Sequence, residues 1–185
     1  MAAPSEVEKI WRFRPSVVEV TPVDEHIMVL RLKLASSLTS VIAVYASTDV
    51  CKLDVKEMFY TKLDSVADSC PRRDIRIVLG DFNAVSRSHQ AGYEISHPDP
   101  HRWTWYSDTS NAIKVIDHIL ISTRLRIPQN CRVYRNAKFC GTDHRLVVAT
   151  FRVPSSPMIT LGCFIWIGWR SVHSAQESIG ECPRI

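Results

Sequence analysis

The chain has 185 residues and a mass of 21.1 kDa, a length that suits one domain with a buried core. Hydrophobic residues make up 45% of the chain and charged residues 23%, which excludes a fully disordered protein. The net charge of +4 permits a nucleic-acid partner without indicating one, because a mixed solvated surface gives the same value.

Signals for export or membrane insertion are absent from the sequence as it stands. Residues 1–8 contain neither a basic segment nor an apolar one of the signal-peptide type. The longest apolar run, Met158 to Trp169, has 12 residues, whereas a spanning helix needs about 20. The six cysteines form no C-x-x-C pair, which argues against a zinc ribbon. We therefore expect an intracellular protein with reduced thiols and no membrane contact, nuclear if it acts on DNA.

The N-terminal quarter predicts one irregular segment and two strands. Residues 1–23 carry no clear period and are interrupted by three prolines. In residues 27–34 every second side chain is apolar, from Met28 to Leu34, which predicts a strand with one buried face. Residues 41–45 are mostly apolar and predict a central strand.

An amphipathic helix of about four turns is predicted next. Thr48 and Asp49 are plausible caps at its start, and Pro71 terminates it. Its apolar residues recur at spacings of three and four: Val55, Phe59, Leu63, Val66 and Cys70.

Short apolar segments predict the remaining strands, at residues 75–79, 102–105, 113–122, 133–139 and 146–153. Residues 84–101 are polar and rich in turn formers, so we expect a loop there. Strands and one helix alternate irregularly, which indicates an α/β or α+β protein. We expect a domain over residues 24–153, preceded by the segment 1–23 and followed by an unassigned tail, 154–185.

Gly80-Asp81-Phe82-Asn83 directly follows a buried strand. Asp81 and Asn83 are two residues apart and can face the same side of an extended segment. A carboxylate and an amide placed this way can hold a water molecule and a phosphate oxygen. The simpler interpretation is an Asx-turn that closes the strand.

Two Asp-His dipeptides, Asp117-His118 and Asp143-His144, lie at predicted strands. A histidine at a strand entrance is usually an ordinary turn or surface residue. A histidine oriented by a carboxylate can instead stabilise the negative charge that develops in phosphoryl transfer. In residues 102–106, Trp103 and Trp105 either pack on one strand face or stack on a base or sugar.

In this order, the motifs resemble the endonuclease/exonuclease/phosphatase superfamily, and more narrowly the endonuclease domain of RTE-type non-LTR retrotransposons. The motifs are a buried strand ending in Tyr45, then G-D-F-N, R-W-T-W, I-D-H and G-T-D-H-R-L-V. The resemblance spans residues 24–153. It implies a DNase I-like, two-layer β-sandwich flanked by helices. It also implies cleavage of phosphodiester or phosphomonoester bonds with Mg²⁺ or Mn²⁺, and DNA as the partner.

The resemblance implies a role for each matching residue. The general base that orients the attacking water is Asp81, the phosphate-positioning amide is Asn83, and the metal-site carboxylate is Asp143. The remaining roles are transition-state stabilisation by His144, orientation of that histidine by Asp117, a phosphate contact by Tyr45, and substrate contacts by Trp105 and Arg102.

The chain departs from the family pattern in two places. No asparagine precedes Asn83 and no glutamine precedes Gln90, so the family's Asn-ended first strand and Glu-ended second strand are not matched. Residues 84–101 are also fewer than the family carries there. We therefore expect a copy truncated at the N-terminus and shortened internally. Its metal site would be weakened by the missing glutamate, because affinity depends on ligand charge.

Three functions remain open at this point. The first is a divalent-metal-dependent DNA endonuclease, impaired by the missing strands. The second is a non-catalytic, retrotransposon-derived remnant that acts as a binding or interaction module. The third keeps the fold and turns to small-molecule or lipid phosphates. The sequence leaves the oligomeric state open.

Overall fold

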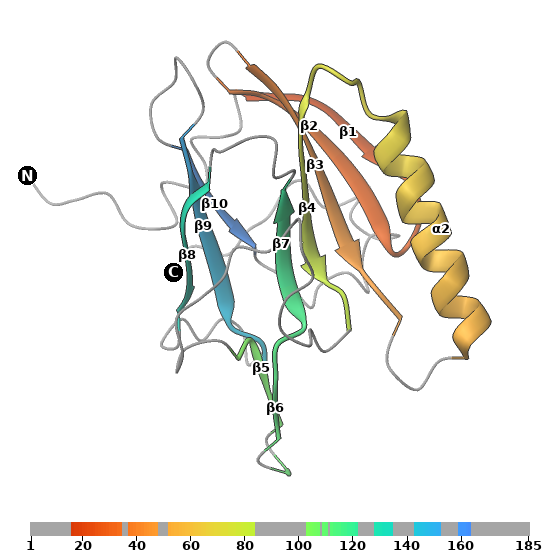
Figure 1. Ribbon diagram of the computed structural model, residues 1–185, viewed down its shortest axis with the longest axis vertical. Coiled ribbons are helices and arrows are strands. Elements are labelled where there is room, and N and C mark those ends of the chain that lie inside the picture. Colours follow the sequence, from red (N-terminus) through yellow and green to blue (C-terminus); the bar gives the residue numbers. More distant parts are fainter. Residues whose placement is uncertain are drawn as a thin grey trace, which may run out of the picture.

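The computed structural model describes residues 16–34, 37–47, 52–83, 103–107, 109–110, 112–121, 128–134, 143–152 and 159–163. These residues form two larger sheets, a short hairpin and one helix, α2, which covers the outer face of the larger sheet (Figure 1). The predicted class, a β-sandwich flanked by helix, is confirmed.

The larger sheet has the strand order β1-β2-β3-β4-β7. Its strands are β1 (Val17–Pro22), β2 (Ile27–Leu34), β3 (Ser37–Tyr45), β4 (Ile75–Asp81) and β7 (Asp117–Ile121). All neighbours are antiparallel except β3 and β4, which run parallel. Because parallel neighbours require a crossover connection, α2 (Leu53–Ser69) lies between them in sequence. The crossover places the carboxyl ends of β3 and β4 side by side.

The smaller sheet has the order β10-β9-β8, with β8 (Pro128–Tyr134), β9 (Leu146–Phe151) and β10 (Ile159–Cys163). A third, two-stranded sheet joins β5 (Trp105–Tyr106) to β6 (Ile113–Lys114). Figure 1 shows this hairpin at one end of the sandwich, where β4 ends and β7 and β9 begin.

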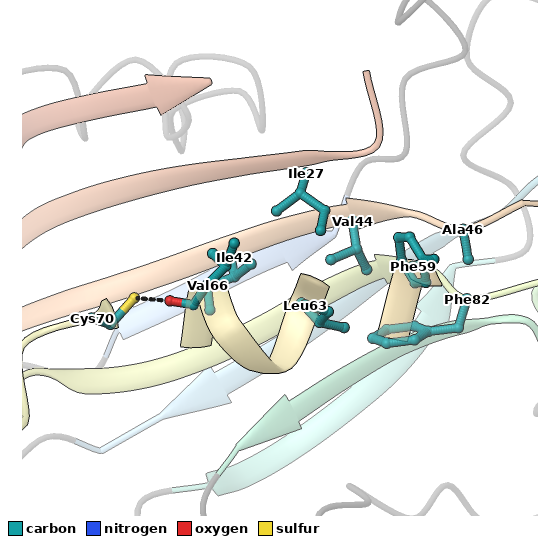
Figure 2. Packing of buried hydrophobic residues seen from close by; sticks show 9 residues of the cluster. All are labelled: Ile27, Ile42, Val44, Ala46, Phe59, Leu63, Val66, Cys70 and Phe82. Carbon is teal, nitrogen blue, oxygen red and sulfur yellow. Dashed lines mark hydrogen bonds between the residues drawn. The ribbon is translucent and has the colours of Figure 1, made fainter. Parts of the chain in front are cut away.

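One half of the core lies between α2 and the larger sheet (Figure 2). Phe59, Leu63 and Val66 are the buried residues of the helix, and they pack on Ile42 and Val44 of β3. The helix spacing therefore fulfils its prediction, although the first expected position, Val55, is exposed. The helix ends at Ser69, and Cys70 is extended, as a residue before a proline must be.

The other half of the core lies between the two sheets. Ile77 of β4 and Ile119 of β7 pack on Val147, Ala149 and Phe151 of β9. Burying branched side chains from both inner faces stabilises the sandwich by about 1.5–3 kcal/mol for each residue. The cluster also fixes β7 against β9, and the site described below is built at the ends of these strands.

Several expected elements differ in the structure. Residues 17–22, expected to be irregular, form β1; its residues are all exposed, so no apolar period marks the strand. The strand expected at 133–139 is β8, which begins at Pro128, and the segment 113–122 contains two strands, β6 and β7. In the tail, β10 pairs with β9. Thr48, Asp49 and the expected loop 84–101 lie outside the described residues.

Candidate active site

The ends of three neighbouring strands bring polar side chains to one edge of the larger sheet. Tyr45 of β3 is in register with Asp81 of β4, and Asp81 is in register with Asp117 of β7. Gly80 makes this close approach feasible: its φ is 151°, and an added Cβ would lie 1.9 Å from the carbonyl oxygen of Val44. Only glycine can adopt this positive φ without strain and also leave room for the Val44 carbonyl.

His144 reaches this edge from the segment that precedes β9. Its backbone forms an isolated bridge with Trp105. The N–H of Arg145 donates to the Thr104 carbonyl at 2.7 Å, and the N–H of Tyr106 donates to the Asp143 carbonyl at 3.2 Å. This short ladder fastens residues 143–145 to β5 and holds His144 over the larger sheet.

The imidazole of His144 lies among three carboxylates. Its Nδ1 is 3.1 Å and 3.2 Å from the two oxygens of Asp117. Its Nε2 is 3.9 Å from Oδ2 of Asp81 and 4.0 Å from Oδ1 of Asp143. Asp81 and Asp117 are 2% and 4% exposed. The sequence-predicted residues Asp81, Asp117, Asp143 and His144 are thus brought together, and we call them the acid–histidine cluster.

Burial raises the pKa of Asp81 to about 6. The backbone N–H of Asn83 and the charge of His144 favour the ionised carboxylate, whereas the charges of Asp117 and Asp143 oppose it. A carboxyl group with this pKa changes its protonation state near neutrality, which is the range a general base requires.

The pKa of His144 is raised above its ordinary value. Burial opposes the protonated ring, but the hydrogen bond to Asp117 and the charges of all three carboxylates outweigh it. Because Asp117 contacts Nδ1, it fixes the orientation of the ring and leaves Nε2 facing Asp81 and Asp143. The imidazole of His144 is therefore held with Nδ1 toward Asp117 and Nε2 toward the other two carboxylates.

Asn83 closes β4 with a backbone N–H donated to Oδ1 of Asp81 at 2.8 Å, which is the Asx-turn of the simpler interpretation. Its φ of 46° is left-handed, which asparagine tolerates better than most residues. The side-chain amide donates to the carbonyl of Ala46 at 2.6 Å. The same turn therefore fixes Asp81 beside His144, and the two interpretations of the motif are compatible.

The other predicted site residues differ in their placement. The indole Nε1 of Trp105 donates to Oδ2 of Asp143 at 2.6 Å, so this tryptophan orients a member of the cluster. The ring of Tyr45 stacks on His26, with centroids 6.4 Å apart. Arg102 lies outside the described residues.

Thr104 is a supporting residue that sequence reasoning missed. Its buried hydroxyl oxygen accepts the backbone N–H groups of Ile116 and Asp117, both at 3.1 Å. These bonds fix the start of β7 and hence the Asp117 carboxylate. Its position between two tryptophans was the available signal, since alternation along a strand places Thr104 on the face opposite to them.

The donor set fits a hard divalent cation. Asp81, Asp117 and His144 each offer one ligand atom, and these atoms lie within 4.8 Å of one another. Such cations prefer carboxylate oxygens, which Asp81 and Asp143 present on the Nε2 side of the histidine. Positive charge there would also relieve the repulsion among the buried carboxylates.

Comparison with known proteins supports this description. The chain is 23% identical to craniofacial development protein 2 of Bos taurus, over 77% of the chain and 29% of that protein. The 3′ phosphatase NExo from Neisseria, solved with a product DNA hairpin, superposes with a TM-score of 0.56 at 22% identity, covering 69% of the chain and 65% of NExo. The fold is that of the endonuclease/exonuclease/phosphatase proteins.

The endonuclease domain of TRAS1, a telomere-specific non-LTR retrotransposon, shows the same fold. Its TM-score is 0.54 at 16% identity, with 70% of the chain and 64% of the TRAS1 domain covered. The predicted resemblance to this superfamily and to retrotransposon endonucleases is thereby confirmed. No family model matches the chain. The chain spans about 29% of the length of the curated relative.

None of the helical structure in the described residues is both long enough and apolar enough to cross a bilayer.

Proposed function

We propose that the chain is a divalent-metal-dependent phosphodiester hydrolase acting on DNA. The observation that carries the proposal is the acid–histidine cluster: a buried histidine held by Asp117 and facing Asp81 and Asp143. Superfamily neighbours with the same fold include a DNA 3′ phosphatase and a retrotransposon endonuclease domain.

Each residue of the cluster has a role in this proposal. Asp81, with its pKa near neutrality, accepts the proton of the attacking water. His144, whose pKa is raised, donates a hydrogen bond from Nε2 to the developing phosphorane oxygen. Asp117 orients the ring, and Thr104 holds Asp117 in place. Asn83 positions the phosphate beside Asp81.

Asp143 is the residue that would hold Mg²⁺ or Mn²⁺, with the Asp81 carboxylate beside it adding negative charge on the same side of His144. When bound, the cation supplies charge neutralisation at the phosphate and at the leaving oxygen. Trp105 keeps Asp143 in place by the hydrogen bond from its indole. We place the catalytic unit within residues 24–153, with the segments 1–23 and 154–185 outside it.

Nicking of supercoiled plasmid tests the proposal. Purified protein with Mg²⁺ should convert supercoiled to open-circular DNA, and EDTA should stop the conversion. Asp81→Ala should lose at least 100-fold in rate while keeping its circular dichroism spectrum. An Asp64→Ala variant, altered at an exposed helix position, serves as the matched control and should cleave normally. Cleavage that survives EDTA or Asp81→Ala would exclude the assigned roles.

A non-catalytic binding module is the second candidate. The observation that favours it is that, among the described residues, the group that could hold a metal ion consists of Asp81, Asp117 and His144 and contains no glutamate. A folded protein that binds DNA with a steep salt dependence, without nicking it, would support this candidate instead.

A further inference from the structure

A small pocket lies beside the acid–histidine cluster, between α2 and the ends of β3 and β4. It measures about 130 Å³ and is lined by Ala46, Ser47, Lys56, Phe59, Tyr60, Phe82 and Asn83. Figure 2 shows Ala46, Phe59 and Phe82 gathered at one end of the helix-side core. Asn83 belongs to both places, because its backbone binds Asp81 while its side chain forms part of the pocket wall.

The walls of this pocket are aromatic. Phe59 and Tyr60 meet edge to face, with centroids 5.2 Å apart. Phe59 also contacts His26, which in turn stacks on Tyr45, the residue in register with Asp81. Ring contacts therefore extend from Tyr45, at the end of β3, to the pocket. Of the pocket's rings, Phe59 and Phe82 are buried and Tyr60 is 39% exposed, so Tyr60 is the ring on which a nucleic-acid base can stack.

The volume of the pocket and the charge of its lining indicate which kind of ligand it can hold. Pockets for drug-sized ligands measure roughly 300–1,000 Å³, so this one suits a single planar ring. Lys56 contributes positive charge to its lining, which a phosphate-bearing ligand needs and an apolar peptide side chain does not. The N-terminal turn of α2 adds Lys52, one turn before Lys56.

We propose that this pocket holds one unstacked base of the DNA strand whose phosphate lies at Asp81 and Asn83. The inference rests on the proposed function and names its substrate class: a strand that is single-stranded, or unpaired, next to the bond that is cleaved. A base within a duplex cannot enter a side pocket without leaving its stack.

The test is binding of a labelled single-stranded oligonucleotide and of its blunt duplex, measured by fluorescence anisotropy with Ca²⁺ in place of Mg²⁺, so that a cation is present beside the carboxylates, and with a gel to show that the oligonucleotide stays intact. Tyr60 is 39% exposed and can be replaced with little effect on folding. We expect Tyr60→Ala to weaken single-strand binding about tenfold, and Tyr60→Phe, which keeps the ring, to stay within about twofold. Duplex binding should be weaker and unaffected by either change.

Two further variants complete the design. Ser47→Phe fills the pocket with a ring of the protein's own and should weaken single-strand binding as Tyr60→Ala does. Tyr134→Ala removes a ring that is 46% exposed on β8, away from the pocket, and should bind normally.

Unchanged single-strand binding in both Tyr60→Ala and Ser47→Phe would overturn the inference, as would equal losses for single strand and duplex. If plasmid nicking persists in that case, the proposed hydrolase stands without this pocket. Tyr60-dependent binding without cleavage of either the plasmid or the single-stranded oligonucleotide in Mg²⁺ would support the pocket and overturn the hydrolase. Absence of DNA binding by the folded wild-type protein would overturn both.

Discussion

Asp74 and Asp81 flank the two ends of β4, and both are buried, yet their surroundings shift their acidity in opposite directions. Asp74 accepts hydrogen bonds from Arg31 at 2.7 Å and 3.2 Å and from the Ser40 hydroxyl at 3.0 Å. The Arg31 bonds hold the pKa of Asp74 below its ordinary value, against the effect of burial.

At the other end of the strand, burial dominates and raises the pKa of Asp81 to about 6. Its charged neighbours include two further carboxylates, Asp117 and Asp143, with His144 as the partner of opposite charge. At one end of β4, the charge of Asp74 is balanced by Arg31, and this pair stabilises the fold. The other end concentrates negative charge, which a fold tolerates where a cation or a reaction uses it.

The largest expected effect lies at the Asp81 end. Asp117→Asn keeps the size of the side chain but removes the charge that orients and supports His144. We expect plasmid nicking to fall about 10²–10⁴-fold, by analogy with other carboxylate–histidine pairs. Single-turnover rates, compared with those of the exposed-site variant Asp68→Asn, would measure it. A loss of less than about threefold would place Asp117 outside the catalytic unit.

Gly80→Ala should disrupt the backbone that supports Asp81. The added methyl group would lie 1.9 Å from the Val44 carbonyl oxygen, and φ at 151° disfavours any side chain. We expect a loss of about 4 kcal/mol or more in the free energy of unfolding, measured by urea denaturation. A milder change at Ala43→Gly, in the adjacent strand, would serve as the comparison. Near-wild-type stability of Gly80→Ala would contradict the close contact between Gly80 of β4 and the Val44 carbonyl of β3.

Asp74→Asn should damage stability rather than chemistry. It removes the charge that binds Arg31 and costs about 1.5–3 kcal/mol of unfolding free energy, because the buried Asp74 side chain loses its charged hydrogen bonds to a partly exposed arginine. Nicking per folded molecule should remain within about twofold of wild type. Urea denaturation and nicking of the same samples would separate the two effects, and a strong catalytic loss without destabilisation would contradict the comparison.

The two acids should also give opposite pH dependences of stability in metal-free protein. Asp74, with a lowered folded-state pKa, stabilises the fold above its unfolded value of 3.8, and this contribution is lost as pH falls through its folded pKa. Asp81 has a raised folded-state pKa, so its contribution falls as pH rises from about 4 to about 6.

Asp81→Asn should therefore remove a decline of up to about 2–3 kcal/mol between pH 4 and pH 6. His144, whose pKa is raised, adds stability below its unfolded value that fades as pH rises through its folded one. Urea denaturation in EDTA measures the Asp81 effect between pH 4 and pH 6 and the His144 effect above pH 6.5. Identical pH profiles for wild type and Asp81→Asn would show that the acid is not perturbed as described.

The elements with a regular spacing of apolar residues could be predicted from the sequence. Apolar alternation in residues 27–34 indicated the strand β2, but the single buried face predicted for it is wrong, because Ile27 packs on the helix side while Leu32 and Leu34 are buried in a different cluster. Helical spacing from Phe59 to Val66 indicated α2, which does bury that periodic face. The family motifs also indicated that Asp117 and His144 act together, and the structure places their side chains in contact.

Other features depend on pairing between distant segments. The hydrogen bond from Trp105 to Asp143 joins residues 38 positions apart, and neither residue alone signals it. β1 carries no apolar period because all its residues are exposed, and it forms by pairing with β2. The role of Thr104 was not predicted because the backbone N–H groups that its hydroxyl accepts, those of Ile116 and Asp117, lie 12 and 13 positions away in the sequence.

The most direct test of the central claim, that the Asp81 end of β4 is built for a divalent cation, is the shift in melting temperature on titration with Mn²⁺. A cation that binds only the folded state raises the melting temperature with concentration. We predict a concentration-dependent rise in wild type and in Asp74→Asn, and none in Asp81→Asn. Equal shifts in all three proteins, or no shift in wild type, would contradict the account.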